Sequence, residues 1–307
     1  MDNTFKQLAS DKLRNVNLQT IDFQWLAKFI IHHSSFIIPR NVFSTGFSLL
    51  FLTIGPLSIS AQNWHLFKKN DSLDCRSFAT DPVFNLYIIT SKNEVLKYDP
   101  QGYFDSRYSN KKYGRIALID GTNAFKVVFW FPDFQTIQLM DALVNPIITL
   151  NLNELGVARA AAVAMSEDGF LWVFDSGTNQ ILKFSADQTG VKLIEKSPTS
   201  LAGLQPTGMT VRQNQIYMNL PNQGIFIFDR FGKRVKTLDI KNVVDFQVID
   251  NQLFYKQNDT LFRFHLQTLA TTEIKLPEGV KGTQAMRLER GRLFVKRGGS
   301  IDVFEEK

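Results

Sequence analysis

The fold is decided by two matching segments, Lys97-Tyr98-Asp99-Pro100-Gln101-Gly102 and Phe228-Asp229-Arg230-Phe231-Gly232-Lys233. Each follows an apolar run that ends in an aromatic residue, and each precedes a second such run. The Asp side chain can cap the backbone of a tight turn, and the Gly can take the positive φ that a bulged hairpin requires. Both segments therefore predict a β-hairpin, and Phe184-Ser185-Ala186-Asp187-Gln188-Thr189-Gly190 predicts a longer variant.

The strand ends beside these turns recur about every forty residues. The equivalent positions are Tyr98, Met140, Phe184, Phe228, Phe264 and Phe304, at intervals of 42, 44, 44, 36 and 40 residues. Two short strands precede each of them, the first at 77–80, 116–119, 161–164, 208–211, 245–248 and 286–288, the second at 86–89, 126–130, 171–174, 216–218, 253–255 and 293–295. This period predicts an all-β protein, a six-bladed β-propeller of four-stranded blades.

The propeller is predicted to occupy residues 62–307, with one short helical turn within 152–162. The sixth copy has only three strands, so we expect residues 64–68 to supply its outer strand and close the ring. Closure by an N-terminal strand removes two sheet edges that would otherwise invite aggregation.

Residues 40–62 have the layout of a secretory signal peptide. Arg40 precedes an apolar run from Val42 to Ile59, and Ser60-Ala61-Gln62 follows it. We predict a signal peptide at 42–61, cleaved after Ala61, and a non-native or disordered extension at 1–41. The alternative is an uncleaved anchor with residues 1–41 in the cytoplasm, although eighteen residues is near the lower limit for spanning a bilayer. Cleavage predicts an exported protein without an integral membrane domain, periplasmic or associated with the outer membrane.

The turn after an aromatic strand end occurs together with Asp168-Gly169-Phe170-Leu171-Trp172-Val173 and its analogue Asn85-Leu86-Tyr87-Ile88. In these features residues 62–307 resemble six-bladed propellers of the NHL-like type, and are similar to exported propeller proteins of Bacteroidota. The resemblance implies a cell-envelope protein that works by binding. Because propellers serve many functions, the fold alone supplies none.

Composition gives no sign of a nucleic-acid partner or a cofactor. The net charge of +6 is scattered, whereas nucleic-acid binding calls for a basic stripe. Cys75 is the single cysteine and is interpreted as a partly buried small residue. The predicted mature part has no Gly-x-Ser-x-Gly elbow and only two histidines, His65 and His265. His265 takes the turn position that Asp99 and Asp229 hold in other copies, so we interpret it as a turn residue. Together, these features predict no catalytic residues.

An enzymatic alternative stays open because some propellers that this chain resembles are calcium-dependent lactonases or related hydrolases. The resemblance implies that a Glu and several Asn or Asp side chains from separate blades would surround the ion, and a calcium ion needs about six to eight oxygen ligands. Glu167 is predicted to lie in a turn, whereas Asp81, Asp120, Asp245 and Asn222 could converge. The prediction is nevertheless no metal site, and glycan binding is a further alternative.

The leading hypothesis is a non-catalytic binding or scaffolding module with a protein partner in the bacterial cell envelope. In a propeller, the hairpins between second and third strands gather at one face, and loops on a rigid scaffold are where recognition usually lies. Acidic and amide side chains in copies two to four and basic ones in copies five and six could orient a partner. The alternative for any single one of these polar residues is an ordinary polar turn. Phe131 and Phe134 fall where a strand ends, so they are candidate exposed anchors, and packing in the core between blades is the alternative. The candidate binding residues are Phe131, Asp133, Phe134, Asp175, Asn179, Asn219, Asn222, Lys256, Lys296 and Arg297.

Overall fold

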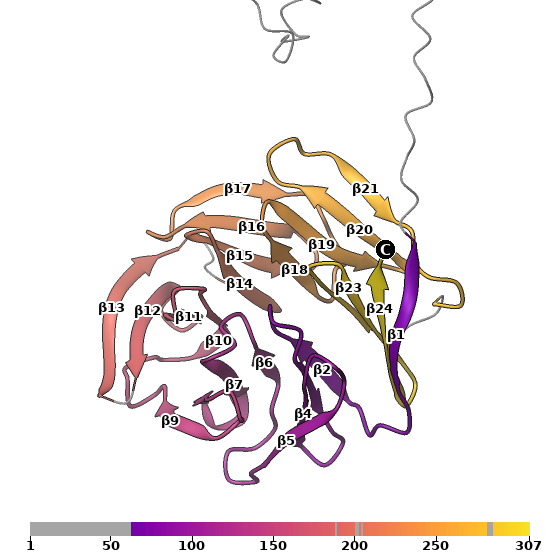
Figure 1. Ribbon diagram of the computed structural model, residues 1–307. Coiled ribbons are helices and arrows are strands. Elements are labelled where there is room, and N and C mark those ends of the chain that lie inside the picture. Colours follow the sequence, from indigo (N-terminus) through magenta and orange to yellow (C-terminus); the bar gives the residue numbers. More distant parts are fainter. Residues whose placement is uncertain (1–62, 188, 200–202, 204, 281–284) are drawn as a thin grey trace, which may run out of the picture. The chain divides into compact units, whose positions relative to one another are not determined.

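The computed structural model describes residues 63–187, 189–199, 203, 205–280 and 285–307, and these ranges form an all-β ring of blades (Figure 1). The predicted segments 1–41 and 42–61 lie outside them. Within the described ranges the one helical segment is a short 3-10 turn, η1 (Pro132–Phe134). None of the helical structure described is long and apolar enough to cross a membrane.

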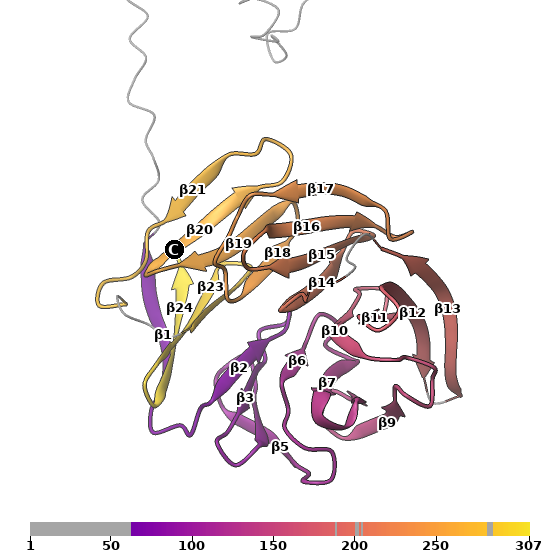
Figure 2. The same ribbon diagram turned by 180° about the vertical axis from the view of Figure 1, so that it is seen from behind.

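The ring consists of six four-stranded antiparallel sheets, which confirms the predicted propeller (Figure 2). The strands of each blade are given from the centre outward. Blade 1 has β2 (Ser77–Thr80), β3 (Leu86–Ile89), β4 (Glu94–Tyr98) and β5 (Phe104–Ser109), and blade 2 has β6 (Leu118–Asp120), β7 (Val127–Phe131), β8 (Thr136–Met140) and β9 (Pro146–Asn151). Blade 3 has β10 (Ala160–Met165), β11 (Leu171–Asp175), β12 (Gln180–Asp187) and β13 (Gly190–Pro198), and blade 4 has β14 (Gly208–Arg212), β15 (Gln215–Leu220), β16 (Gly224–Asp229) and β17 (Arg234–Leu238). Blade 5 has β18 (Phe246–Ile249), β19 (Gln252–Gln257), β20 (Thr260–His265) and β21 (Thr271–Ile274), and blade 6 has β22 (Ala285–Glu289), β23 (Arg292–Arg297), β24 (Ser300–Glu306) and β1 (Trp64–Asn70).

The strand ends predicted to be equivalent occupy the same place in every blade. Each lies opposite the first apolar residue of the second strand, as in the pairs Tyr98 with Leu86 and Phe228 with Ile216. In blades 1 to 4 the pairing with the outer strand shifts register at this residue, so the bulge of the predicted hairpin recurs. Gly102 and Gly232 have φ values of 80° and 77°, the positive φ that the turn was predicted to require.

Strand β1 closes the ring. It pairs antiparallel with β24, from Trp64 opposite Glu306 to Asn70 opposite Ile301, and therefore supplies the outer strand of blade 6. Figure 1 shows this indigo strand beside the yellow β24. The predicted closure by an N-terminal strand is present.

The hydrophobic core lies between neighbouring blades, as six clusters of buried side chains that each draw on two consecutive blades. In β7 the side chains alternate between two of these clusters. Phe129 and Phe131 face blade 1, whereas Val128 and Trp130 face blade 3. A strand buried on both faces reads as a continuous apolar run, which is why the middle strands stand out in the sequence.

The segment 152–162 contains a short turn at 152–156 but no regular helix. The amides of Leu155 and Gly156 donate to the carbonyls of Leu152 and Asn153, forming single turns. Gly156 then takes a φ of 79°, a left-handed conformation that ends any helical path, and β10 begins at Ala160.

The antiparallel order gives the ring two different faces. The turns between first and second strands and between third and fourth strands lie at one end of each sheet, which we call the turn face. The hairpins between second and third strands, together with the links between blades, lie at the other end, which we call the hairpin face.

Candidate functional site

The residues predicted as a binding site lie on or near the hairpin face, but four of the ten are buried. These are Phe131, Asp175, Asn219 and Lys296, which are 0%, 1%, 1% and 9% exposed. Phe131 takes the core-packing alternative and is not an exposed anchor, because its position in β7 directs the ring into the core between blades 1 and 2. There it packs edge to face on Tyr113, at 5.7 Å between ring centres.

Asp175 holds the link between blades 2 and 3. Its carboxylate accepts hydrogen bonds from the amides of Ala158 and Arg159 at 3.0 and 2.9 Å, from the Gly177 amide and from the Thr178 hydroxyl. Burial acts to raise the pKa of Asp175, but these hydrogen bonds outweigh it and leave the pKa below its ordinary value.

Asn219 and Lys296 also brace the backbone. The Asn219 side-chain amide donates to the Val243 carbonyl at 2.7 Å and to the Thr207 hydroxyl at 3.0 Å. The Lys296 ammonium donates to the Arg76 carbonyl at 3.0 Å, joining blade 6 to the chain that enters blade 1. Polar side chains at these turns therefore satisfy backbone groups of this chain.

The other six predicted residues lie nearer the surface. Asp133, Phe134 and Asn222 are exposed, although the Asp133 carboxylate accepts from the Arg115 amide at 2.9 Å. Asn179, Lys256 and Arg297 are half-buried, and Arg297 donates to the Gly279 carbonyl and pairs with Asp302. Sequence reasoning missed Val244, which is 91% exposed on the same face and could be found as an apolar residue in a polar link.

Among the residues that the structure describes, the turn face carries more exposed apolar side chains than the hairpin face. They come from turns of blades 1, 2, 4 and 5, and Leu143 and Phe231 each stand two residues after a turn-capping Asp. The set comprises Val83, Tyr103, Phe125, Leu143, Phe231 and Leu269, each between 49% and 81% exposed. Sequence reasoning missed these residues, and the signal that could have found them is an apolar residue inside a polar turn.

Where blade 6 meets blade 1, aromatic and basic side chains stack in two groups that we together call the seam cluster: Phe67, Phe84 and Arg292 in one, and Lys68 and Tyr103 in the other. The Arg292 guanidinium lies 4.4 Å from the ring centre of Phe67 and 4.5 Å from that of Phe84. The Lys68 ammonium lies 4.5 Å from the ring centre of Tyr103. Phe84 has a φ of 71°, which is a strained conformation for a bulky side chain.

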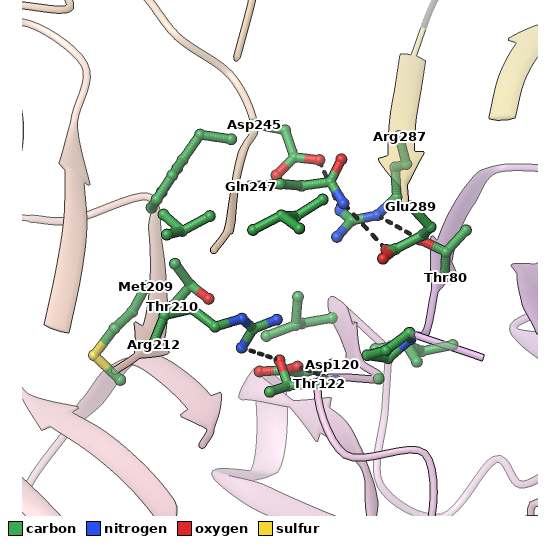
Figure 3. Close-up of a pocket in the computed structure, with 17 residues that line it drawn as sticks. Thr80, Asp120, Thr122, Met209, Thr210, Arg212, Asp245, Gln247, Arg287 and Glu289 are labelled. Atoms are coloured by element: carbon green, nitrogen blue, oxygen red, sulfur yellow. Dashed lines mark hydrogen bonds and ion pairs between the residues drawn. The ribbon is translucent and has the colours of Figure 1, made fainter. Parts of the chain in front are cut away.

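A polar cavity of about 80 Å³ lies at the centre of the ring (Figure 3). It is lined by the inner strands β2, β6, β14, β18 and β22, which belong to five blades. Asp245, whose side chain is 63% exposed, contributes to the lining. The polar residues that line the cavity are Thr80, Asp120, Thr122, Thr210, Arg212, Asp245, Gln247, Arg287 and Glu289.

One wall of the cavity is a hydrogen-bonded network from blades 5, 6 and 1. The Thr80 hydroxyl donates to Glu289 Oε1 at 2.6 Å, and the Gln247 amide donates to the same oxygen at 3.2 Å. The Arg287 guanidinium donates to Thr80 at 3.2 Å and to the Asp245 carboxylate at 3.1 Å. Burial raises the pKa of Glu289, against the opposing effects of Arg287, Thr80 and Arg212.

Arg212 and Asp120 lie on the facing wall. Arg212 Nη1 donates to the Thr122 hydroxyl at 2.8 Å and to the Val211 carbonyl at 3.0 Å. The Asp120 carboxylate accepts from the amides of Thr122 and Met165, at 2.9 and 2.8 Å. Figure 3 shows Arg212 and Glu289 on opposite sides of the open space.

The four residues considered for calcium do not come together. Asp120 and Asp245 both line the cavity. Asp81 instead folds into its own turn, where it accepts from the amides of Val83 and Asn85. Asn222 lies on the hairpin face. In the described ranges no group of three His, Cys, Asp or Glu side chains is close enough to hold a metal ion.

Two further predictions concern single residues. The Thr268 amide donates to His265 Nδ1 at 3.2 Å, so His265 does cap the turn as the corresponding Asp residues do. Cys75 is half-buried, and burial raises the pKa of its thiol to about 11. The thiol is therefore protonated at neutral pH and a poor nucleophile.

No known protein family and no curated protein matches the chain significantly. Among solved structures, it is similar to the WD40 domain of Neurospora crassa Pan2, with a TM-score of 0.58 and 10% identity over 80% of this chain and 96% of that one. It is also similar to virginiamycin B lyase from Staphylococcus aureus, with a TM-score of 0.54 and 14% identity over 80% of this chain and 88% of that one. At such identities the likeness shows the propeller fold alone.

Proposed function

We propose that this chain is a non-catalytic binding propeller of the bacterial cell envelope, and that it holds a protein partner on its turn face. The observation that supports this is the set of six apolar side chains, 49% to 81% exposed, on turns of four blades. Exposed apolar patches are typical of protein interaction surfaces, and we infer that a partner contacts several of these turns together. Among the described residues, the hairpin face offers two large exposed apolar side chains, Phe134 and Val244.

The seam cluster adds aromatic and basic side chains to this surface. Its Phe, Tyr and Arg side chains include the residue types that contribute most to protein binding. The stacking of Arg292 between Phe67 and Phe84 limits their motion before a partner arrives, which reduces the entropy lost on binding. The strained φ of Phe84 is consistent with this role, since backbone strain tends to persist at functional sites.

The envelope location rests on the signal-like segment at residues 42–61. If this segment is cleaved after Ala61, the mature protein starts at Gln62. Mass spectrometry of the N-terminal peptide of the cell-derived protein measures this directly, and an intact segment 42–61 would contradict it.

The binding surface is tested by recovering the tagged chain from cell envelopes and quantifying the proteins that accompany it. Three double variants are compared with the unchanged chain. Phe125→Ser with Phe231→Ser alters the turn face, and Phe134→Ser with Val244→Ser alters the hairpin face. Leu193→Ser with Ile194→Ser removes similarly apolar side chains, 45% and 46% exposed, from the outer strand β13 and is the matched control.

We expect the amount of a defined partner recovered with the turn-face variant to fall by about tenfold or more. The reason is that truncating an anchor side chain at an interface costs about 1 kcal/mol or more of binding free energy. The other two variants should retain it, and circular dichroism should show all three folded. Equal retention by every variant would overturn the proposal. Loss of the partner from the hairpin-face variant alone would place the binding surface on the hairpin face, as the sequence predicted.

A further inference from the structure

The central cavity is a second site, separate from the apolar side chains of the turn face. Its volume is about 80 Å³. On this measure one water molecule takes about 10–15 Å³, so the cavity has room for roughly five to eight non-hydrogen atoms. A ligand of that size would lie among the inner strands of five blades.

Glu289 offers this cavity an unused acceptor. It is 7% exposed, and its Oε1 accepts hydrogen bonds from Thr80 and Gln247. Its Oε2 has no hydrogen-bond donor among the residues that the structure describes. This oxygen keeps access to the open space of the cavity, so a donor supplied by a ligand can replace the water that hydrates it.

Arg212 offers the complementary donor. Its side chain is 17% exposed, and its two hydrogen bonds both use Nη1. In the described part of the chain, Nη2 has no acceptor and Nε lies 3.9 Å from Glu167 Oε1, beyond hydrogen-bond distance. Nε thus forms only a long ion pair with Glu167, whose side chain is 61% exposed and whose charge is screened by solvent. Nη2 remains a donor that a ligand carboxylate can bind.

The two groups carry opposite charges and do not meet. No ion pair within 4.0 Å joins Arg212 to Glu289, and Figure 3 shows the open space between them. A simple anion would face the carboxylates of Asp120, Asp245 and Glu289. A simple cation would face the guanidinium groups of Arg212 and Arg287. A small molecule with both charges satisfies both walls.

We propose that the central cavity binds a small α-amino acid of glycine to threonine size, with the carboxylate on Arg212 and the ammonium group donating to Glu289 Oε2. Thr210 and Gln247 line the space between these two residues and can accommodate a short or hydroxylated side chain. Larger amino acids exceed the volume.

The test is calorimetric titration of the full chain with glycine, alanine and serine, and with two matched probes. Propionate lacks the ammonium group of alanine, and alaninamide lacks its carboxylate. We expect alanine to bind at least about tenfold more tightly than either probe, because each probe leaves one wall unpaired. Arg212→Gln and Glu289→Gln should each weaken alanine binding by about tenfold or more. Arg234→Gln, on the outer strand β17, is the control and should change nothing.

Failure of all three amino acids to bind at about 10 mM would overturn the proposal, since this is weaker than any useful recognition. Propionate binding as tightly as alanine would remove the role of Glu289, and equal binding of alaninamide would remove that of Arg212. These two probe comparisons use the unchanged chain, so they decide the question even if a cavity variant does not fold.

Discussion

At the scale of single residues, a polar side chain in a turn has two possible uses. It can remain free for a partner, or it can satisfy a backbone group of its own chain. Asp175 and Asn219 belong to the second kind, because their hydrogen bonds reach backbone atoms 16 and 24 residues away. A buried amide or carbonyl without a partner costs about 1–3 kcal/mol, which explains why such side chains are held inside.

Glu289 is the residue whose ionisation should affect stability most clearly. Because burial raises its pKa in the folded state, its contribution is fully present below its ordinary pKa and is lost as pH rises through the raised value. Glu289→Gln keeps an oxygen acceptor for Thr80 and Gln247 but removes the charge. We therefore expect the free energy of unfolding of Glu289→Gln to improve relative to the unchanged chain as pH rises.

Urea unfolding of both proteins across a pH series from mildly acidic to neutral measures this difference. Glu278→Gln is the control, because its side chain is exposed and pairs with no other described residue. The prediction would be contradicted if the difference in free energy of unfolding between Glu289→Gln and the unchanged chain stayed the same at every pH.

At the scale of elements, the four-residue turn that begins with Asp is the repeated unit. Its fourth residue takes a positive φ, and this residue is Gly102 and Gly232 in two turns but Phe84 and Val144 in two others. The amide of the fourth residue donates to the carbonyl of the first in each of these turns. The hydrogen bond and the Asp cap therefore hold the shape even where a side chain disfavours it.

Substitution at Phe84 should show this strain. Phe84→Gly and Phe84→Ala both lose the ring, but only alanine keeps a Cβ in the left-handed region. We expect Phe84→Gly to be more stable than Phe84→Ala by about 1 kcal/mol in urea unfolding.

Phe78, in strand β2 and without a positive φ, is the matched control. There the order should reverse, with alanine more stable than glycine by about 0.5–1 kcal/mol. Equal stability of the two Phe84 variants would show that the turn is not strained.

At the scale of the whole molecule, the ring is held closed in two places. Strand β1 completes blade 6 from the outside. Near the centre, Thr80 of blade 1 donates to Glu289 of blade 6 across 209 residues of sequence. The apolar cluster between these blades joins Leu86 and Ile88 to Phe294, Ile301 and Val303.

Removal of β1 should open the ring. A chain of residues 71–307 leaves the edge of β24 unpaired and uncovers Phe304, which is 7% exposed in the closed ring. We expect its melting temperature to fall by about 10 °C or more relative to a chain of residues 63–307. We also expect molecules of the shortened chain to associate through the free edge of β24. Calorimetry and sedimentation measure both effects.

A peptide of residues 63–70 added in excess should restore the melting temperature, and a scrambled peptide should not. An unchanged melting temperature in the shortened chain would mean that the inner contacts alone hold the ring.

The sequence by itself determined the strands, their order and the number of blades. Strand alternation and Asp-x-x-Gly turns depend on neighbouring residues, and their forty-residue period counts the copies directly. The tertiary structure alone decided which turn residues are free and where a cavity lies. Asp175 and Phe131 look available in the sequence, but their surroundings come from other blades and links. The cavity joins Thr80, Arg212 and Glu289, which ring closure brings together and no local spacing records.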